Sequence, residues 1–119
     1  MARLTLRIEF GPDCAIGPGK VRLLELVGDL GSISAAGRAM GMSYRRAWLL
    51  IDSLNRSFKN PAVATQLGGP GGGGAALTEF GKKIVEHYRA MEAEAAKFLA
   101  ERLQALEDEL AQHAAERKE

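Results

Sequence analysis

Two short helical segments separated by a two-residue turn constrain this chain more than any other feature. Small residues fill the first segment, and Gly41 ends it after Met40. Ser34 can cap that helix, and Ser43 can cap the next one, because a serine hydroxyl accepts from the free amides of a first turn. Two helices joined by so tight a turn, with a glycine in it, predict a helix-turn-helix.

The second helix, predicted from Ser43 to Phe58, separates into faces. Its apolar positions share one stripe that should face the core: Ala47, Ile51, Leu54 and Phe58. Recognition helices contact bases mainly through their first turns, and arginine suits bidentate contact with a guanine edge. We therefore expect DNA to be contacted by the polar first turn and the outward stripe: Ser43, Tyr44, Arg45, Arg46, Leu49 and Arg56. Trp48 is more typical of packing, and Arg56 can instead pair with Asp52.

Charge is unevenly distributed along the chain. Residues 1–77 hold nine Lys and Arg against five Asp and Glu, a net +4, whereas residues 78–119 hold seven against ten, a net −3. Within residues 38–59 five cations are opposed only by Asp52: Arg38, Arg45, Arg46, Arg56 and Lys59. Such clustering is typical of a surface that meets phosphates, although a solvated basic face is the alternative. Lys59 joins the predicted DNA contacts.

The segments around this pair complete a small domain. Alternation predicts a strand over Leu4–Phe10, helical spacing predicts a first helix over Lys20–Leu30, and residues 62–77 read as a β-hairpin with a glycine-rich loop. A hairpin directly after a helix-turn-helix is a wing. Its tip, Gly71, Gly72 and Gly73, lets backbone amides approach a phosphate. A nucleotide-binding loop is disfavoured because no Lys-Ser/Thr follows; an inert turn is the other alternative.

A last helix is predicted from Thr78 to about Ala115, ~55 Å at about 1.5 Å per residue. Its apolar positions step by three or four and predict a seam against a partner helix, a solitary solvated helix being the alternative: Ile84, Tyr88, Met91, Ala95, Leu99, Leu103, Leu106 and Leu110. The predicted fold class is mainly α with a small β-hairpin. It comprises a winged helix-turn-helix DNA-binding domain over residues 1–77 and a long dimerisation helix with a charged tail over residues 78–119.

Several function classes are disfavoured by composition. A single cysteine, Cys14, excludes an internal disulfide and a cysteine-rich metal site. His87 and His113 lie far apart, without the clustered ligands of a metal site, so we expect no enzyme, no metal and no cofactor. No apolar run reaches membrane-spanning length and no signal-peptide pattern is seen, which predicts a cytoplasmic protein with no membrane partner.

The helical pair also carries a family resemblance. The run GSISAAGRAMGMSYRRAWLLIDSLNRSF (residues 31–58), followed by GGPGGGGAALTEFG (residues 68–81), resembles the N-terminal domain of ModE-type molybdenum-responsive regulators. More distantly, residues 31–54 are similar to the N-terminal domain of LysR-type regulators. The match covers about residues 18–90, and MSYRRAW (residues 42–48) with the glycine-rich wing makes it specific.

The resemblance implies a homodimer that binds a palindromic operator. It assigns Ser43, Tyr44, Arg45 and Arg46 to the recognition helix and residues 71–74 to the wing tip. In this family a C-terminal oxyanion-binding domain senses molybdate, whereas this chain continues into a charged tail. We therefore expect that the chain alone does not sense molybdate, and a separate oxyanion-binding partner protein is a candidate for its regulation.

Two functions from different classes follow. The first is a sequence-specific double-stranded DNA-binding transcription regulator linked to molybdenum metabolism. The alternative is a protein–protein interaction module that uses the winged helix and the long helix without DNA binding. Binding to duplex DNA with a steep salt dependence separates the two.

Overall fold

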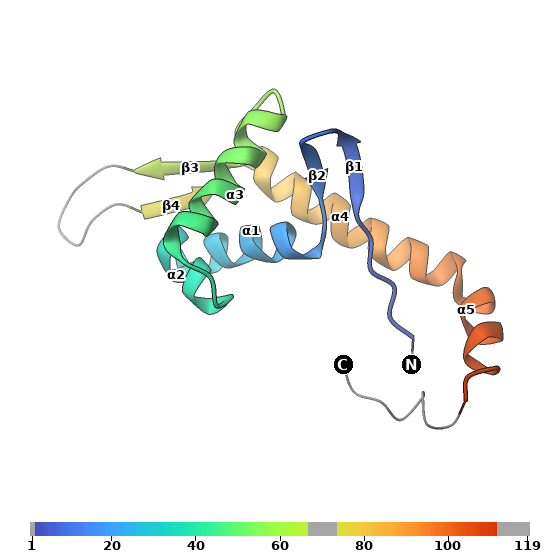
Figure 1. Cartoon of the computed structure of the whole chain (residues 1–119). Helices are drawn as coiled ribbons and strands as arrows, with labels where there is room; N and C mark the ends of the chain where they lie inside the picture. Colours follow the sequence, from blue (N-terminus) through green and yellow to red (C-terminus); the bar gives the residue numbers. More distant parts are fainter. Residues whose placement is uncertain (1, 67–73, 112–119) are drawn as a thin grey trace.

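A computed structural model describes residues 2–66 and 74–111 of the chain. Regular structure runs through both described segments (Figure 1). In chain order the elements are β1 (Ile8–Gly11), β2 (Cys14–Ile16), α1 (Pro18–Leu30), α2 (Ile33–Ala39), α3 (Tyr44–Ser57), β3 (Val63–Gln66), β4 (Gly74–Leu77), α4 (Glu79–Phe98) and α5 (Ala100–Glu107).

The helix ends follow from residues that satisfy the free backbone groups. Ser43 caps α3 as predicted, its hydroxyl accepting from the Arg46 amide at 3.1 Å. The cap of α2 is Ser32 rather than Ser34, and its hydroxyl accepts from the Ala35 amide at 3.1 Å. Gly41, at φ 73°, makes the left-handed turn that places α3 directly after α2.

One core lies where α1, α2, α3, the start of α4 and the base of the second hairpin meet. Its largest fully buried side chains come from three helices: Val21, Leu23, Leu24 and Val27 of α1, Leu54 of α3 and Tyr88 of α4. Gly37 of α2 permits the close approach of α3, because a Cβ there would lie 3.0 Å from the Ala47 methyl carbon. Small residues in α2 therefore set the spacing of the helical pair.

Two separate antiparallel hairpins flank the helices. β1 pairs with β2, Ile8 opposite Ile16, with an irregularity before Gly11. β3 pairs with β4, Val63 opposite Leu77 and Gln66 opposite Gly74. The second hairpin is joined to the helices through the Ala75 amide, which donates to the Gly31 carbonyl at the end of α1 (3.0 Å).

The predicted fold class, a winged helix-turn-helix plus one long C-terminal helix with a single small β-hairpin, is wrong. The described residues form five helices and two small two-stranded sheets. The strand expected over Leu4–Phe10 is only β1, and its partner β2 is too short for periodicity to reveal. The last helix ends at Phe98, and Leu99 (φ −97°, ψ 5°) turns the chain into α5.

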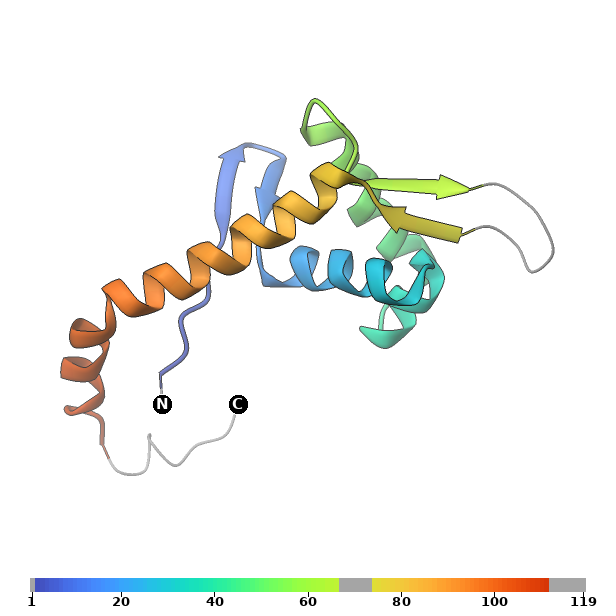
Figure 2. The same ribbon diagram turned by 180° about the vertical axis from the view of Figure 1, so that it is seen from behind.

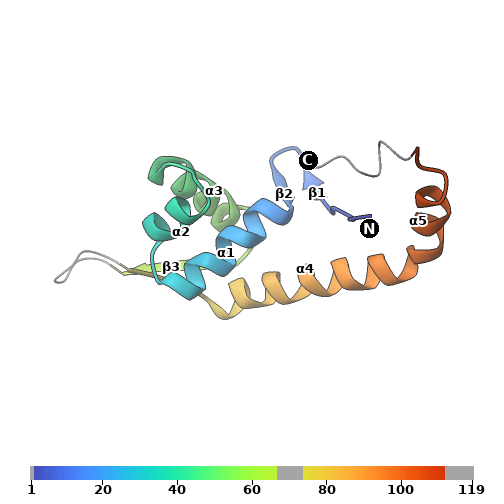
Figure 3. The same cartoon turned by 90° about the horizontal axis from the view of Figure 1, so that it is seen from below.

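No helix breaker accounts for the break between α4 and α5. No glycine or proline lies there. Past the break, α5 turns toward the N-terminal segment, where the Ala2 amide donates to the Glu107 carboxylate at 2.7 Å. Figures 2 and 3 show the resulting angle between the long helix and the short one. The described part of the chain therefore has an elongated shape, 57 × 29 × 25 Å.

Candidate nucleic-acid interface

The first turn of α3 is exposed to solvent. Its position is set by the cap at Ser43 and by the apolar stripe that α3 buries on its opposite side. Ala47, Ile51 and Leu54 are buried against the core, which fixes the rotation of the helix. Arg45 and Arg46 are consequently exposed, and Leu49 is 47 % exposed on the outward stripe. Among the described residues neither arginine has an ion-pair partner. Two uncommitted cations at an exposed helix start are suited to a polyanion.

One flank of α3 faces the β3–β4 hairpin, and Asn55 fixes this contact. Its side-chain oxygen accepts from the amides of Ala62 (2.8 Å) and Val63 (3.1 Å), while its amide nitrogen donates to the Val63 carbonyl (3.1 Å). All three hydrogen bonds reach the start of β3. Helix and hairpin are thereby held in one orientation. Asn55 was not among the predicted site residues. Helical spacing places it on the same flank as Trp48, and this was the signal in the sequence that could have identified it.

Tyr44 and Trp48 lie on this same flank, nearer the start of α3. They are 56 % and 43 % exposed. Together with the start of α2 and the open ends of β3 and β4 they line a hollow of about 320 Å³. Trp48 therefore lies at the surface beside the arginines, although its sequence context also suits a packing residue.

The other flank of α3 faces the N-terminal segment and the start of α1. Arg46 lines a hollow of about 370 Å³ there with Arg7 and Lys20. The Lys20 ammonium donates to the Ala15 carbonyl at 2.9 Å, and Arg7 pairs with Glu9 at 3.0 Å. Sequence reasoning missed Arg7 and Lys20, because only the fold brings these distant cations beside α3.

The remaining predicted DNA contacts are placed unevenly. Arg56 pairs with Asp52 at 3.0 Å, the alternative that the i,i+4 spacing offered. Lys59 is exposed just past the end of α3, and Ser43 is engaged as its cap. Gly71, Gly72 and Gly73 lie outside the described residues.

The predicted dimerisation seam is divided by the structure. Ile84 and Tyr88 lie in the core of the same chain, at 6 % and 0 % exposure, so they are not available to a partner. The other six positions are half-buried or exposed: Met91, Ala95, Leu99, Leu103, Leu106 and Leu110. Phe98, 88 % exposed on the last turn of α4, is a large apolar side chain that the spacing rule left out.

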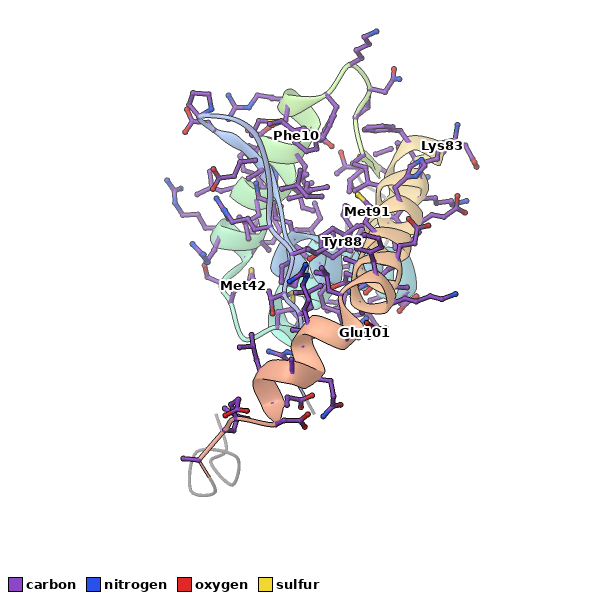
Figure 4. The ribbon with its side chains drawn as sticks, turned by 90° about the vertical axis from the view of Figure 1, so that its right-hand side faces the viewer. Phe10, Met42, Lys83, Tyr88, Met91 and Glu101 are labelled. Atoms are coloured by element: carbon purple, nitrogen blue, oxygen red, sulfur yellow. The ribbon has the colours of Figure 1, made fainter. Side chains whose placement is uncertain are left out.

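Two polar contacts hold α4 against the body of the chain. The buried Tyr88 hydroxyl donates to the Leu6 carbonyl at 2.7 Å, and burial raises the pKa of that hydroxyl, so it stays a donor. Arg89 binds Glu25 of α1 through two nitrogens, at 2.9 and 3.0 Å. The Arg89 hydrogen bonds lower the pKa of Glu25, and the carboxylate in turn raises the pKa of Arg89. Figure 4 labels Tyr88 and Met91 on α4 and Glu101 on α5.

Other kinds of site find little support. In residues 2–66 and 74–111 no group of three His, Cys, Asp or Glu side chains is placed to hold a metal ion. Over the same residues, no helix combines the length and the apolar character needed to cross a membrane.

The chain is similar to molybdenum-related proteins of several bacteria. It is 44 % identical over 84 residues to the molybdenum-pterin-binding protein MopB of Rhodobacter capsulatus, covering 71 % of this chain and 31 % of that protein. It is 40 % identical over 94 residues to the molybdenum transport protein ModE of Azotobacter vinelandii, covering 79 % and 34 %. No family model matches the chain.

A third relative carries a more specific name. The DNA-binding transcriptional dual regulator ModE of Escherichia coli K12 is 32 % identical over 87 residues, covering 73 % of this chain and 33 % of that protein. The chain thus spans about a third of the length of these relatives. Their names describe molybdenum-binding, transport and regulatory proteins, and none of them is the name of an enzyme.

Proposed function

We propose, from this similarity to ModE-type proteins, that the chain binds double-stranded DNA sequence-specifically and regulates transcription in molybdenum metabolism. The observation that carries the proposal is the exposed first turn of α3, where Arg45 and Arg46 have no ion-pair partner among the described residues. A capped helix with arginines at its start can enter a major groove and read base edges. One relative is itself named as a DNA-binding regulator.

The rigid support of α3 favours this function over a merely solvated basic face. Asn55 locks one flank to the β3–β4 hairpin, and the core holds the buried stripe. A recognition element must keep its side chains in register with the bases, and such support reduces the ordering cost of binding. Arg46, Arg7 and Lys20 on the opposite flank are suited to a phosphate strand bordering the groove.

We extend the proposal to a homodimer on a palindromic operator. The exposed apolar positions from Met91 to Leu110, with Phe98, supply the surface that a second copy can cover. They lie on the part of α4 and on α5 that project away from α3 (Figure 3). Two recognition helices related by such a dimer should meet half-sites one helical turn apart or a multiple of it.

The direct test is fluorescence anisotropy of a labelled duplex of about 30 base pairs, room for two half-sites, selected by the protein from a random-sequence pool. We expect log affinity to fall linearly with log salt, with a slope of about −0.9 per phosphate neutralised. Arg45→Ala should cost about 1–3 kcal/mol and relax discrimination against scrambled duplex. Lys59→Ala should weaken all sequences alike.

The matched control is Arg102→Ala, which removes the same charge from the exposed face of α5. It should leave operator discrimination unchanged. A salt slope near zero for the unaltered chain would contradict DNA binding and favour the protein–protein interaction module, whose test is capture of a partner by α4 and α5. Unchanged discrimination in Arg45→Ala would reduce Arg45 to a phosphate contact.

A further inference from the structure

The hollow between α3 and the β3–β4 hairpin has an unusual chemical lining. None of the described residues that line it is charged, and the cation at its edge is Arg38, which donates to the Ser34 hydroxyl at 2.9 Å. Its walls are the Tyr44 and Trp48 rings, the Thr65 and Ser34 side chains and the backbone where β4 begins. In the part of the chain that the structure describes, the Tyr44 hydroxyl, the Trp48 indole N–H and the Thr65 hydroxyl have no hydrogen-bond partner. Residues with three neutral donors and two aromatic rings therefore line one hollow.

The exposure of these groups is what a binding surface requires. Tyr44 and Trp48 are 56 % and 43 % exposed, although α3 has a well-formed buried stripe of its own. Tyrosine and tryptophan combine a large apolar face with a polar tip, which makes them the commonest residues at the centre of interfaces. Exposing the apolar surface of both rings to solvent is unfavourable, and a bound DNA strand can cover that surface.

The position of the hollow indicates which part of a duplex it meets. Tyr44, Trp48 and Asn55 form one flank of α3, and Asn55 places that flank against the hairpin. Arg45 lies on the outward stripe, where bases are reached when the helix lies in the major groove. The strand that borders the groove on the hairpin side must then pass over the flank, that is, over the hollow.

We infer that this hollow binds the sugar-phosphate backbone of the strand bordering the major groove, with Trp48 and Tyr44 as its principal contacts. The inference rests on the proposed DNA binding and adds a site that is not on the basic face. Neutral hydroxyl and N–H donors are standard phosphate contacts, and the sugar can pack on the aromatic faces. The opposite flank meets the second strand with Arg46, Arg7 and Lys20, so α3 is bracketed by one neutral and one cationic contact.

The salt dependence of DNA binding should distinguish the two flanks of α3. A cation that neutralises a phosphate releases counterions and steepens the salt dependence, whereas a neutral donor releases none. Trp48→Ala should therefore weaken binding about tenfold, the scale of an aromatic interface residue, without changing the salt slope. Lys20→Ala, on the cationic flank, should make the slope shallower by about 1.

Trp48 is the only tryptophan in the chain, so its emission reports on the hollow directly. In the unaltered protein we expect the emission to shift to the blue or be quenched as the selected duplex is titrated, with the same midpoint as the anisotropy. Tyr44→Phe removes only a hydroxyl and should weaken binding less than Trp48→Ala. Trp48→Phe keeps the packing and serves where Trp48→Ala does not fold, as judged by circular dichroism.

Single methylphosphonate substitutions in the duplex locate the contact. At one phosphate position, the methylphosphonate should weaken binding by the unaltered protein. The same substitution should not weaken binding by Trp48→Phe any further, because that variant has already lost the indole N–H. The affinity ratio between selected and scrambled duplex should stay the same in Trp48→Ala and fall in Arg45→Ala. A fall in Trp48→Ala would overturn the inference in favour of a base contact in the hollow.

The outcomes also separate this inference from the proposed function. Absence of any anisotropy change with the unaltered chain would overturn both. Salt-dependent binding with unchanged Trp48 emission, or with full affinity in both Trp48 variants, would overturn the hollow alone and leave the DNA-binding proposal in place. A shallower salt slope in Trp48→Ala would also overturn the inference, because a neutral contact releases no counterions.

Discussion

The two halves of α4 carry the same amphipathic spacing and have opposite environments. In the first half Gly81, Ile84 and Tyr88 are buried against the rest of the chain. In the second half and in α5, Met91, Phe98 and Leu106 are 37 %, 88 % and 70 % exposed. The difference teaches that helical periodicity identifies an apolar face but does not identify what covers it. The first half is covered within the chain, and the second half remains available.

The strongest test of this contrast is Tyr88→Ala, at the centre of the buried half. Removing a fully buried aromatic side chain should cost about 3–5 kcal/mol of the free energy of unfolding. Tyr88→Phe keeps the ring and loses the hydrogen bond to the Leu6 carbonyl, so it should cost about 1–3 kcal/mol. Urea unfolding followed by circular dichroism measures both. Equal costs for the two variants would mean that the hydroxyl, not the ring, supplies the stability.

Gly81→Ala is expected to have the next largest effect. A Cβ at Gly81 would clash with the Ala62 carbonyl oxygen, which comes from the backbone and cannot swing away. The helix start must then move from the base of the hairpin, at a cost of about 1–3 kcal/mol. The matched control is Gly19→Ala in α1, where a Cβ meets nothing within 4 Å. It should be neutral or stabilising by about 0.5–1 kcal/mol; similar losses in both variants would rule out the clash.

Leu106→Glu tests the exposed half. Leu106 is 70 % exposed, so the substitution should change the stability of the single chain by less than about 0.5 kcal/mol. In the proposed homodimer the added charge is buried or repelled, and the dimer dissociation constant should rise about tenfold or more, which is about 1.4 kcal/mol. Sedimentation velocity over a concentration series measures this. Glu101→Gln, on the exposed surface of α5, is the control, and an unchanged constant in Leu106→Glu would place the interface elsewhere.

The smallest effect should come from the Glu25–Arg89 pair that joins α4 to α1. Arg89 lowers the pKa of Glu25 in the folded chain, so the pair's stabilisation is complete above the ordinary value of 4.5. It is lost as the pH falls through the lower folded-state pKa. Glu25→Gln should cost about 1 kcal/mol at pH 7 and make the stability less dependent on pH in the acid range. An acid limb identical to that of the unaltered chain would exclude Glu25 from acid unfolding.

Local chemistry determined much of the helical part of the fold. Ser43 caps α3, Gly41 makes the turn before it, and Thr78 caps α4, its hydroxyl accepting from the Gly81 amide at 2.9 Å. Residues within four positions of one another decide such contacts, so sequence spacing is enough to predict them. The exposed place of Arg45 also follows from the buried stripe of the same helix. Its contact with DNA remains a prediction.

Contacts between distant segments were decided only by the tertiary structure. No spacing rule pairs the three residues of β2 with β1, joins Asn55 to the start of β3, or brings Arg7 and Lys20 beside Arg46. The same holds for the end of α4 at Phe98 and for the burial of Tyr88 beneath Leu6. The sequence by itself determined which faces are apolar and where α3 and α4 begin. Which residues cover each apolar face depends on contacts between segments far apart in the sequence, such as Tyr88 and Leu6, which are 82 positions apart. Only folding of the chain brings such residues together.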